Sequence, residues 1–268
     1  MKGCIVYNDS LKSESYIENI SLFSKQMDLP TMSNAELCSM KKIKLDYCVF
    51  LDKDITLARF LEKNNIKVFN SSSAIETCDN KAHTYISLYN KVNMPETKFS
   101  PLSYFESAVI EPLSYPFVVK ECYGSWGKQV YLVHNFEEYQ KVVYSFNTRP
   151  YIIQEYIEAN GTDYRLYTVG GKVVACMQRK NARDFRANCE LGGIASPFIP
   201  SNEMIVVAEK AASALQLDFG GIDLMVDNTG KVFFIEANSS AQISNLQKAT
   251  NVNIPAILFE YIKKQLDF

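Results

Sequence analysis

The sequence of 268 residues contains few of the side chains that build common metal and covalent sites. It has only two histidines, His83 and His134, so we do not expect a histidine-based metal centre. Its seven cysteines are scattered, and no two of them form a C-x-x-C pair. An odd, dispersed set is typical of reduced thiols and not of a disulfide framework or a zinc site. We therefore expect a cytoplasmic protein.

Long apolar runs and an excess of one charge are absent as well. No segment approaches the roughly 18–20 continuous apolar residues of a membrane span, and the apolar run at the N-terminus is too short for a signal peptide. The 28 basic and 30 acidic residues give a net charge of −2. We therefore expect neither nucleic acid nor a membrane as a partner, and a bound anion must be held by locally placed cations.

What the sequence does contain is enough apolar material for a large core, with 47% hydrophobic and 12% aromatic residues. Apolar strands alternate with helical patterns over 1–75, which predicts a small parallel α/β unit. Strands and helices then follow in mixed order, and the chain is rich in strands from residue 165. In this part we predict helices at 79–91, 136–144, 201–215 and 254–265, and strands at 116–120, 130–133, 151–157, 166–169 and 173–178.

Residues 220–238 predict a β-hairpin around an Asp-Asn-Thr-Gly turn at 227–230. Alternation predicts one apolar face, made by Ile222, Leu224 and Val226 on the first strand and by Phe233, Ile235 and Ala237 on the second. If Asp227 pairs with Val232, the same register places Asp223 opposite Glu236, and Asn238 shares the face of Glu236.

Two carboxylates directly opposite each other repel, and a divalent cation would remove that repulsion. The oxygen ligands of Asp223, Glu236 and Asn238 suit Mg²⁺. By itself, the hairpin favours an exposed polar sheet face over a metal site.

Three further segments carry residues suited to a nucleotide. Lys120 ends an apolar strand and precedes a loop with Gly124 and Gly127, which suits a phosphate cradle or an ordinary turn. The Walker spacing and a G-x-G-x-x-G after the first strand are both absent. The segment 154–157 suits an adenine edge or a polar strand end. Four cations within 179–186 suit phosphate oxygens or a solvated loop.

Taken in order, these motifs resemble those of the RimK-type ATP-grasp ligases over about 68–265. The matching motifs are D-N-K ending at Lys81, P-F-V-V-K ending at Lys120, G-S-W-G at 124–127, Q-E-Y-I at 154–157, G-T-D-Y-R ending at Arg165, D-F-R-A-N ending at Asn188 with G-G at 192–193, G-G-I-D ending at Asp223 and I-E-A-N ending at Asn238. The resemblance implies an α/β protein with an ATP-grasp fold. A small N-terminal parallel α/β domain would span 1–75, the central or lid subdomain 76–155, and the C-terminal subdomain with the metal site 156–268.

The resemblance also implies the roles of individual residues. Lys81 and Lys120 would contact the phosphates of ATP, with the loop of Gly124, Ser125 and Gly127 over them. The remaining nucleotide contacts would come from Gln154, Glu155, Tyr156, Ile157, Asp163 and Asn188. Arg165, Arg179 and Arg186 would be catalytic, and Asp223, Glu236 and Asn238 would bind Mg²⁺. Two Mg²⁺ ions are expected, for which Mn²⁺ could substitute.

The implied activity joins a carboxylate to an amine. ATP phosphorylates the carboxylate, the amine attacks the acyl phosphate, and phosphate leaves. Small-molecule or peptide carboxylates and amines are the implied partners, including amino acids and carrier-protein termini, and a homo-oligomer is expected. Two alternatives remain open from the sequence: a kinase that phosphorylates a hydroxyl group with the same fold, and a non-catalytic nucleotide-binding module.

The chain departs from the family pattern at four places. Gln129 replaces the last glycine of the phosphate loop, after an added charge at Lys128. The segment 239–242 replaces a frequent Pro-Gly, Glu190 stands where a basic pair is frequent, and 51–54 lacks a frequent arginine. Because 239–242 and Glu190 would lie on the substrate side, we do not carry the acceptor specificity of the family over to this chain.

Overall fold

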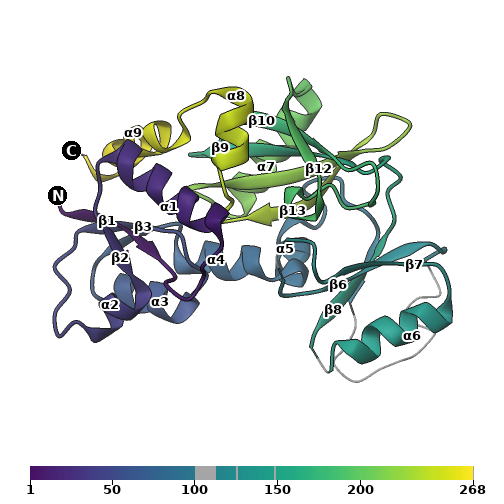
Figure 1. Ribbon diagram of the computed structural model, residues 1–268, viewed down its shortest axis with the longest axis horizontal. Helices are drawn as coiled ribbons and strands as arrows, with labels where there is room; N and C mark the ends of the chain where they lie inside the picture. The colour runs from purple at the N-terminus through teal and green to yellow at the C-terminus, as the bar shows by residue number, and fades with distance from the viewer. Residues whose placement is uncertain (100–112, 125, 148, 268) are drawn as a thin grey trace.

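The computed structural model describes residues 1–99, 113–124, 126–147 and 149–267, which form three β-sheets with helices packed against them (Figure 1). The first sheet is parallel, in the order β2 (Thr31–Ser33), β1 (Gly3–Tyr7), β3 (Tyr47–Phe50), β4 (Lys67–Phe69). Its helices are α1 (Glu14–Met27), α2 (Asn34–Ser39) and α3 (Ile55–Lys63). This confirms the predicted parallel α/β unit. The short β2 and α2 were not predicted.

The second sheet is antiparallel, in the order β5 (Thr97–Phe99), β8 (Tyr151–Glu155), β6 (Phe117–Glu121), β7 (Val130–Val133). Helix α6 (Phe136–Ser145) covers one face, where Tyr139 and Val143 pack with Phe117, Val119 and Ile153 in one apolar core. The opposite face carries the polar side chains of Lys120 and Gln154. The helix 136–144 was predicted correctly, whereas β8 ends at Glu155, earlier than the predicted Ile157.

The third sheet is also antiparallel, in the order β11 (Ile194–Pro197), β10 (Lys172–Lys180), β9 (Thr162–Val169), β12 (Phe219–Val226), β13 (Val232–Asn238). Helix α7 (Asn202–Ala214) packs on β9, β12 and β13. The other face packs against α8 (Ser244–Thr250) and α9 (Ile254–Leu266). A 3₁₀ turn at Cys189–Leu191 precedes β11.

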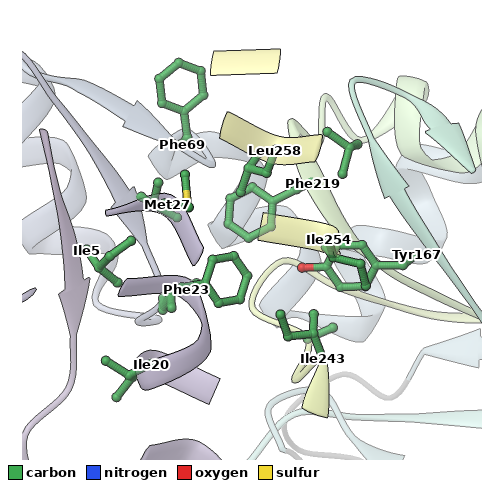
Figure 2. Close-up of a cluster of buried hydrophobic side chains, with 14 of the residues drawn as sticks. Ile5, Ile20, Phe23, Met27, Phe69, Tyr167, Phe219, Ile243, Ile254 and Leu258 are labelled. Carbon is green, nitrogen blue, oxygen red and sulfur yellow. The ribbon is translucent and has the colours of Figure 1, made fainter. Parts of the chain in front are cut away.

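One apolar core joins the first sheet to the third (Figure 2). Phe23 and Met27 of α1 pack with Phe219 of β12 and with Ile254 and Leu258 of α9. Each of these five side chains is buried. Removing its apolar surface from water stabilises the fold by about 2 kcal/mol. The N-terminal sheet is therefore held firmly beside the hairpin that carries Asp223 and Glu236.

The predicted helix at 79–91 is wrong in its bounds. The chain forms two helices there, α4 (Ser72–Asp79) and α5 (Lys81–Leu88), with Asn80 between them in extended conformation. The Asn80 side chain accepts hydrogen bonds from the N–H groups of Ala82 (2.9 Å) and His83 (3.2 Å), which caps α5. The predicted polar break at 70–73 ends at Ser71, which caps α4 through the N–H of Ala74. Lys81 consequently begins a helix.

The hairpin register is partly as predicted. Asp223 does pair with Glu236, but Val226 pairs with Val232, and a bulge between Asp223 and Leu224 accounts for the difference. The predicted apolar face is therefore wrong at two positions of the second strand: Val232 and Phe234 join the core under α7 instead of Phe233 and Ile235, whereas Ala237 joins it as predicted. The bulge turns Ile235 toward the same side as Glu236, where both line a cavity.

Among the helices of the described residues, none combines the length and the apolar character that a membrane span requires. The three sheets lie within the ranges 1–75, 76–155 and 156–268. The division into three domains stays a prediction, because the first and third sheets share a core.

Candidate active site

A cavity lies between the second and third sheets and encloses about 750 Å³, its open mouth included. Most of the predicted site residues line it: Lys81, Lys120, Gly127, Gln154, Glu155, Tyr156, Ile157, Asp163, Arg179, Arg186, Asn188, Asp223 and Glu236. Apolar walls come from Val118, Phe185, Met225 and Ile235, which we did not predict. Met225 could have been found, because it alternates with Asp223 on one face of the strand. Ile235 could not, because only the bulge turns it inward. We call this space the nucleotide cavity.

Lys120 and Gln154 form a buried polar pair on the second sheet. The Lys120 ammonium donates to Gln154 Oε1 at 2.6 Å, and Gln154 Nε2 donates to Thr97 Oγ1 at 2.9 Å. Lys120 is only 8% exposed. Burial lowers the pKa of Lys120 to about 8, although Glu236 opposes the change and Lys81 adds to it. An anion in the cavity would offset this buried charge.

Lys81, at the start of α5, reaches across to the third sheet. Its Nζ lies 3.4 Å from Glu236 Oε1 and 3.3 Å from the Gly124 carbonyl oxygen. Lys81 thus connects the glycine loop with the hairpin. Gly124 itself does not line the nucleotide cavity, and Ser125 lies outside the described residues.

Asp223 belongs to a network of alternating charges on β9, β10 and β12. Arg165 donates twice to Asp223, at 2.7 Å each, and Arg179 donates to Asp223 at 3.0 Å. Arg179 also holds Asp163, at 2.6 and 2.7 Å. Burial tends to raise the pKa of Asp223, but the two arginines outweigh it and lower that pKa to about 2.

This network changes the electrostatic argument for a metal. Asp223 and Glu236 do face each other, but arginines offset the charge of the first and Lys81 that of the second. Their opposition therefore does not require a cation.

The residues present nevertheless fit an oxygen-ligated cation. Asp223 and Glu236 line this cavity, Glu236 and Asn238 line its neighbour, and all three side chains offer oxygen atoms of the kind that Mg²⁺ prefers. The described residues hold no group of three or more His, Cys, Asp or Glu side chains placed for a metal. Such an ion would therefore rest on two carboxylates and one amide.

Arg186 ties the glycine loop to the third sheet. Asp184 orients the guanidinium, which donates to the carbonyl oxygens of Gly127 (2.8 Å) and Val130 (3.3 Å). Gly127 has φ +70°, and a Cβ there would lie 2.8 Å from Asn188 Oδ1. A side chain at this position would therefore be strained and would collide with a predicted ligand-binding residue.

A second cavity adjoins the first and encloses about 1430 Å³, its open mouth included. The structure places Arg165 and Asn238 here and not in the nucleotide cavity. Arg179, Asn188 and Glu236 line both cavities. All four departures from the family pattern contribute to its lining: Asp52 and Lys53, Lys128 and Gln129, Glu190, and Ser240–Gln242. We call this space the second cavity.

The sequence of this chain is similar to those of known proteins. The RimK-like ATP-grasp domain family matches residues 77–262. The chain is 31% identical over 217 residues to N-acetylaspartylglutamate synthase A of Homo sapiens, covering 78% of this chain and 56% of that protein. The chain thus spans about half the length of this relative.

Solved structures show the same fold. D-alanine–D-alanine ligase from Bacillus anthracis complexed with ATP superposes with a TM-score of 0.77 at 17% identity, covering 98% of this chain and 96% of that one. The ATP-grasp ligase PsnB complexed with a precursor variant, Mg and ADP has a TM-score of 0.72 at 13% identity and covers 98% of each chain. The predicted ATP-grasp fold and ligase class are confirmed. This chain belongs to the RimK-like ATP-grasp family of ligases.

Proposed function

We propose that this protein is an ATP- and Mg²⁺-dependent ligase that joins the carboxylate of one amino acid, peptide or small molecule to the amine of another. One relative is named N-acetylaspartylglutamate synthase A and one structural neighbour D-alanine–D-alanine ligase, which supports amino-acid substrates. Two Mg²⁺ ions, replaceable by Mn²⁺, a cytoplasmic location and self-association remain predictions.

The observation that carries this proposal is the meeting of two cavities at shared residues. A ligase must hold a nucleotide and two further substrates next to one another. The nucleotide cavity and the second cavity share Arg179, Asn188 and Glu236, so the transferred phosphoryl group would lie at their junction. A module that only binds ATP has no need of the second space.

In the proposed complex, Lys81 and Lys120 bind phosphate oxygens, and 154–157 provides the edge for adenine. Asp163 spends both carboxylate oxygens on Arg179. We therefore propose that Asp163 positions Arg179 at the junction. Asp223, Glu236 and Asn238 would hold Mg²⁺, which when bound offsets negative charge on the phosphate oxygens.

The reaction balances without a side-chain nucleophile. A carboxylate oxygen of the acid attacks the γ-phosphorus of ATP, and ADP leaves. The amine then attacks the acyl carbon, phosphate departs with the bonding electrons, and the amine loses a proton. Arg165 and Arg186 lie on the two sides of the junction, where their charges would stabilise the negative oxygens that develop.

The test measures ADP release with pairs of acids and amines, together with the mass of the product. We expect ADP release that requires both an acid and an amine and yields a product whose mass is their sum less one water. Hydroxylamine added in place of the amine should give a hydroxamate, because it traps an acyl phosphate.

Two outcomes would contradict the proposal. A stable phosphorylated hydroxyl compound that resists hydroxylamine would show a kinase. Equal ATP affinity with and without Mg²⁺, and no turnover with any pair, would show a binding module.

A further inference from the structure

The second cavity contains a buried carboxylate that has no role in the proposed chemistry. Asp52 is 5% exposed and lines this cavity. Its oxygens accept from the side-chain amides of Asn8 (3.1 Å) and Asn34 (3.3 Å) and from the N–H of Lys53 (2.7 Å). These donors are all neutral. Within the described chain, no cationic side chain pairs with Asp52.

An unpaired buried carboxylate is costly, because it loses hydration without gaining a counter-charge. Burial accordingly raises the pKa of Asp52, and the hydrogen bonds only partly oppose this. The other charged groups around the cavity differ. Lys53 pairs with Asp79, Arg165 with Asp223, and Glu236 lies near Lys81. Asp52 is thus a buried carboxylate without a counter-charge, whereas these other charged side chains of the cavity lie next to a group of opposite charge.

The position of Asp52 in the first sheet also points to a ligand. β1 is flanked by β2 on one side and β3 on the other, so the direction of the chain connections reverses between β1 and β3. In open parallel sheets, ligands bind outside the carboxyl ends of the strands at this point. Asn8 directly follows β1 and Asp52 follows β3, and the hydrogen bond between them spans the crevice.

The surrounding charges favour the same kind of ligand. The exposed Glu190 adds to the lining a carboxylate that, like Asp52, has no cationic partner among the described residues. Lys128 is the lining cation without a carboxylate partner in the described residues, and its ammonium lies 5.0 Å from the ring centroid of Trp126. Lys128 would suit the carboxylate of a substrate that is itself charged at both ends.

We propose that Asp52 binds an ammonium group of the substrate in the second cavity, one that stays charged because it is not the attacking amine. This inference rests on the proposed ligase function and specifies its substrate class. The ammonium belongs either to the α-amino group of an amino acid whose carboxylate is activated or to the side chain of a basic amino acid that supplies the amine. Asp52 is therefore a specificity-determining residue, separate from the phosphoryl-transfer groups.

The experiment compares pairs of related ligands with and without the ammonium. Alanine against lactate tests the acid substrate, and lysine against norleucine tests the amine substrate. Binding is measured by calorimetry in the presence of ADP and Mg²⁺, and KM by ADP release. The wild-type protein should bind the charged member of at least one pair about 10- to 100-fold more tightly. D52N should lose that preference, and E203Q, an exposed carboxylate on α7, should keep it.

Two further measurements guard against a variant that fails to fold. Thermal unfolding of D52N checks that the protein remains folded. E190Q, a substitution at an exposed position, should reduce the same preference by a smaller factor. A wild-type protein without preference for either ammonium, or a preference that D52N retains, would overturn the inference. Ammonium-selective binding without ADP release would refute the ligase function and leave the binding site supported.

Discussion

The nucleotide cavity and the second cavity differ in how the protein treats charge. In the first, each arginine or lysine that would meet phosphate is held by a carboxylate, an amide or a carbonyl of the chain. In the second, Asp52 and Lys128 have no ionic partner among the described residues. A site for an invariant ligand can be organised in advance by internal ion pairs. A site that selects its substrate keeps charges available for it.

The largest expected effect comes from breaking the internal pairing. Arg179 is 3% exposed and bridges Asp163 and Asp223. Arg179→Met leaves two buried carboxylates without their shared cation, so the free energy of unfolding should fall by about 3–5 kcal/mol. Urea denaturation measures this. Arg59→Met removes an exposed ion pair with Glu76 and should cost less than about 1 kcal/mol. If the two variants lost the same free energy of unfolding, the buried network would stabilise the protein no more than an exposed ion pair does.

The next prediction concerns Glu236, at the junction of the cavities, where a substitution should reduce turnover without reducing stability. Glu236 is 30% exposed and lies on the proposed metal site. Glu236→Ala should reduce turnover by about 100- to 1000-fold, because charge on the transferred phosphoryl group is no longer offset. Its unfolding midpoint in urea should stay close to that of the wild type. A strongly unfolded variant would assign Glu236 a structural role instead.

Much of the nucleotide cavity was predictable because its residues follow local rules. Lys120 and Gln154 lie on strands with clear apolar patterns. The predicted Asp223–Glu236 pair is present, although the turn register was wrong by one residue and the bulge compensates for the error. The rest depends on tertiary structure. The bulge that turns Ile235 inward leaves no local signal, and neither does the Arg179–Asp163 pair, which joins neighbouring strands.

The second cavity was not predicted, although part of its lining was noted as departures from a pattern. Asp52 and Gln242 are far apart in the sequence, and the shared core of the first and third sheets brings their segments together. The rule that ligands bind at the carboxyl ends of parallel strands would have pointed to Asn8 and Asp52 once the strand order was known. That order was not predicted, because β2 was missed.

A third effect tests the buried lysine of the nucleotide cavity through pH. Burial lowers the pKa of Lys120 to about 8, and bound phosphate should raise it, because phosphate favours the charged form. Above the pKa that Lys120 has in the free protein, ATP binding is therefore coupled to the uptake of a proton by Lys120. ATP affinity should be highest below about pH 8 and should fall by up to about tenfold per unit above it.

The measurement is calorimetry of ATP binding from about pH 7.5 to about pH 9.5. Lys120→Arg should flatten the profile, since arginine stays charged throughout this range. A wild-type affinity that does not change with pH would contradict the assignment of Lys120 to the phosphates.

The smallest effect on ATP should come from a lysine of the second cavity. Lys128 is exposed, lines only the second of the two cavities and lies against Trp126. Lys128→Gln should raise the KM for ATP by less than about threefold, because an exposed charge at this distance is strongly screened. Lys120→Gln, the matched change in the nucleotide cavity, should raise it far more. If the two variants weakened ATP equally, the phosphates would extend into the second cavity, and the separation of a pre-organised nucleotide site from a selective substrate site would fail.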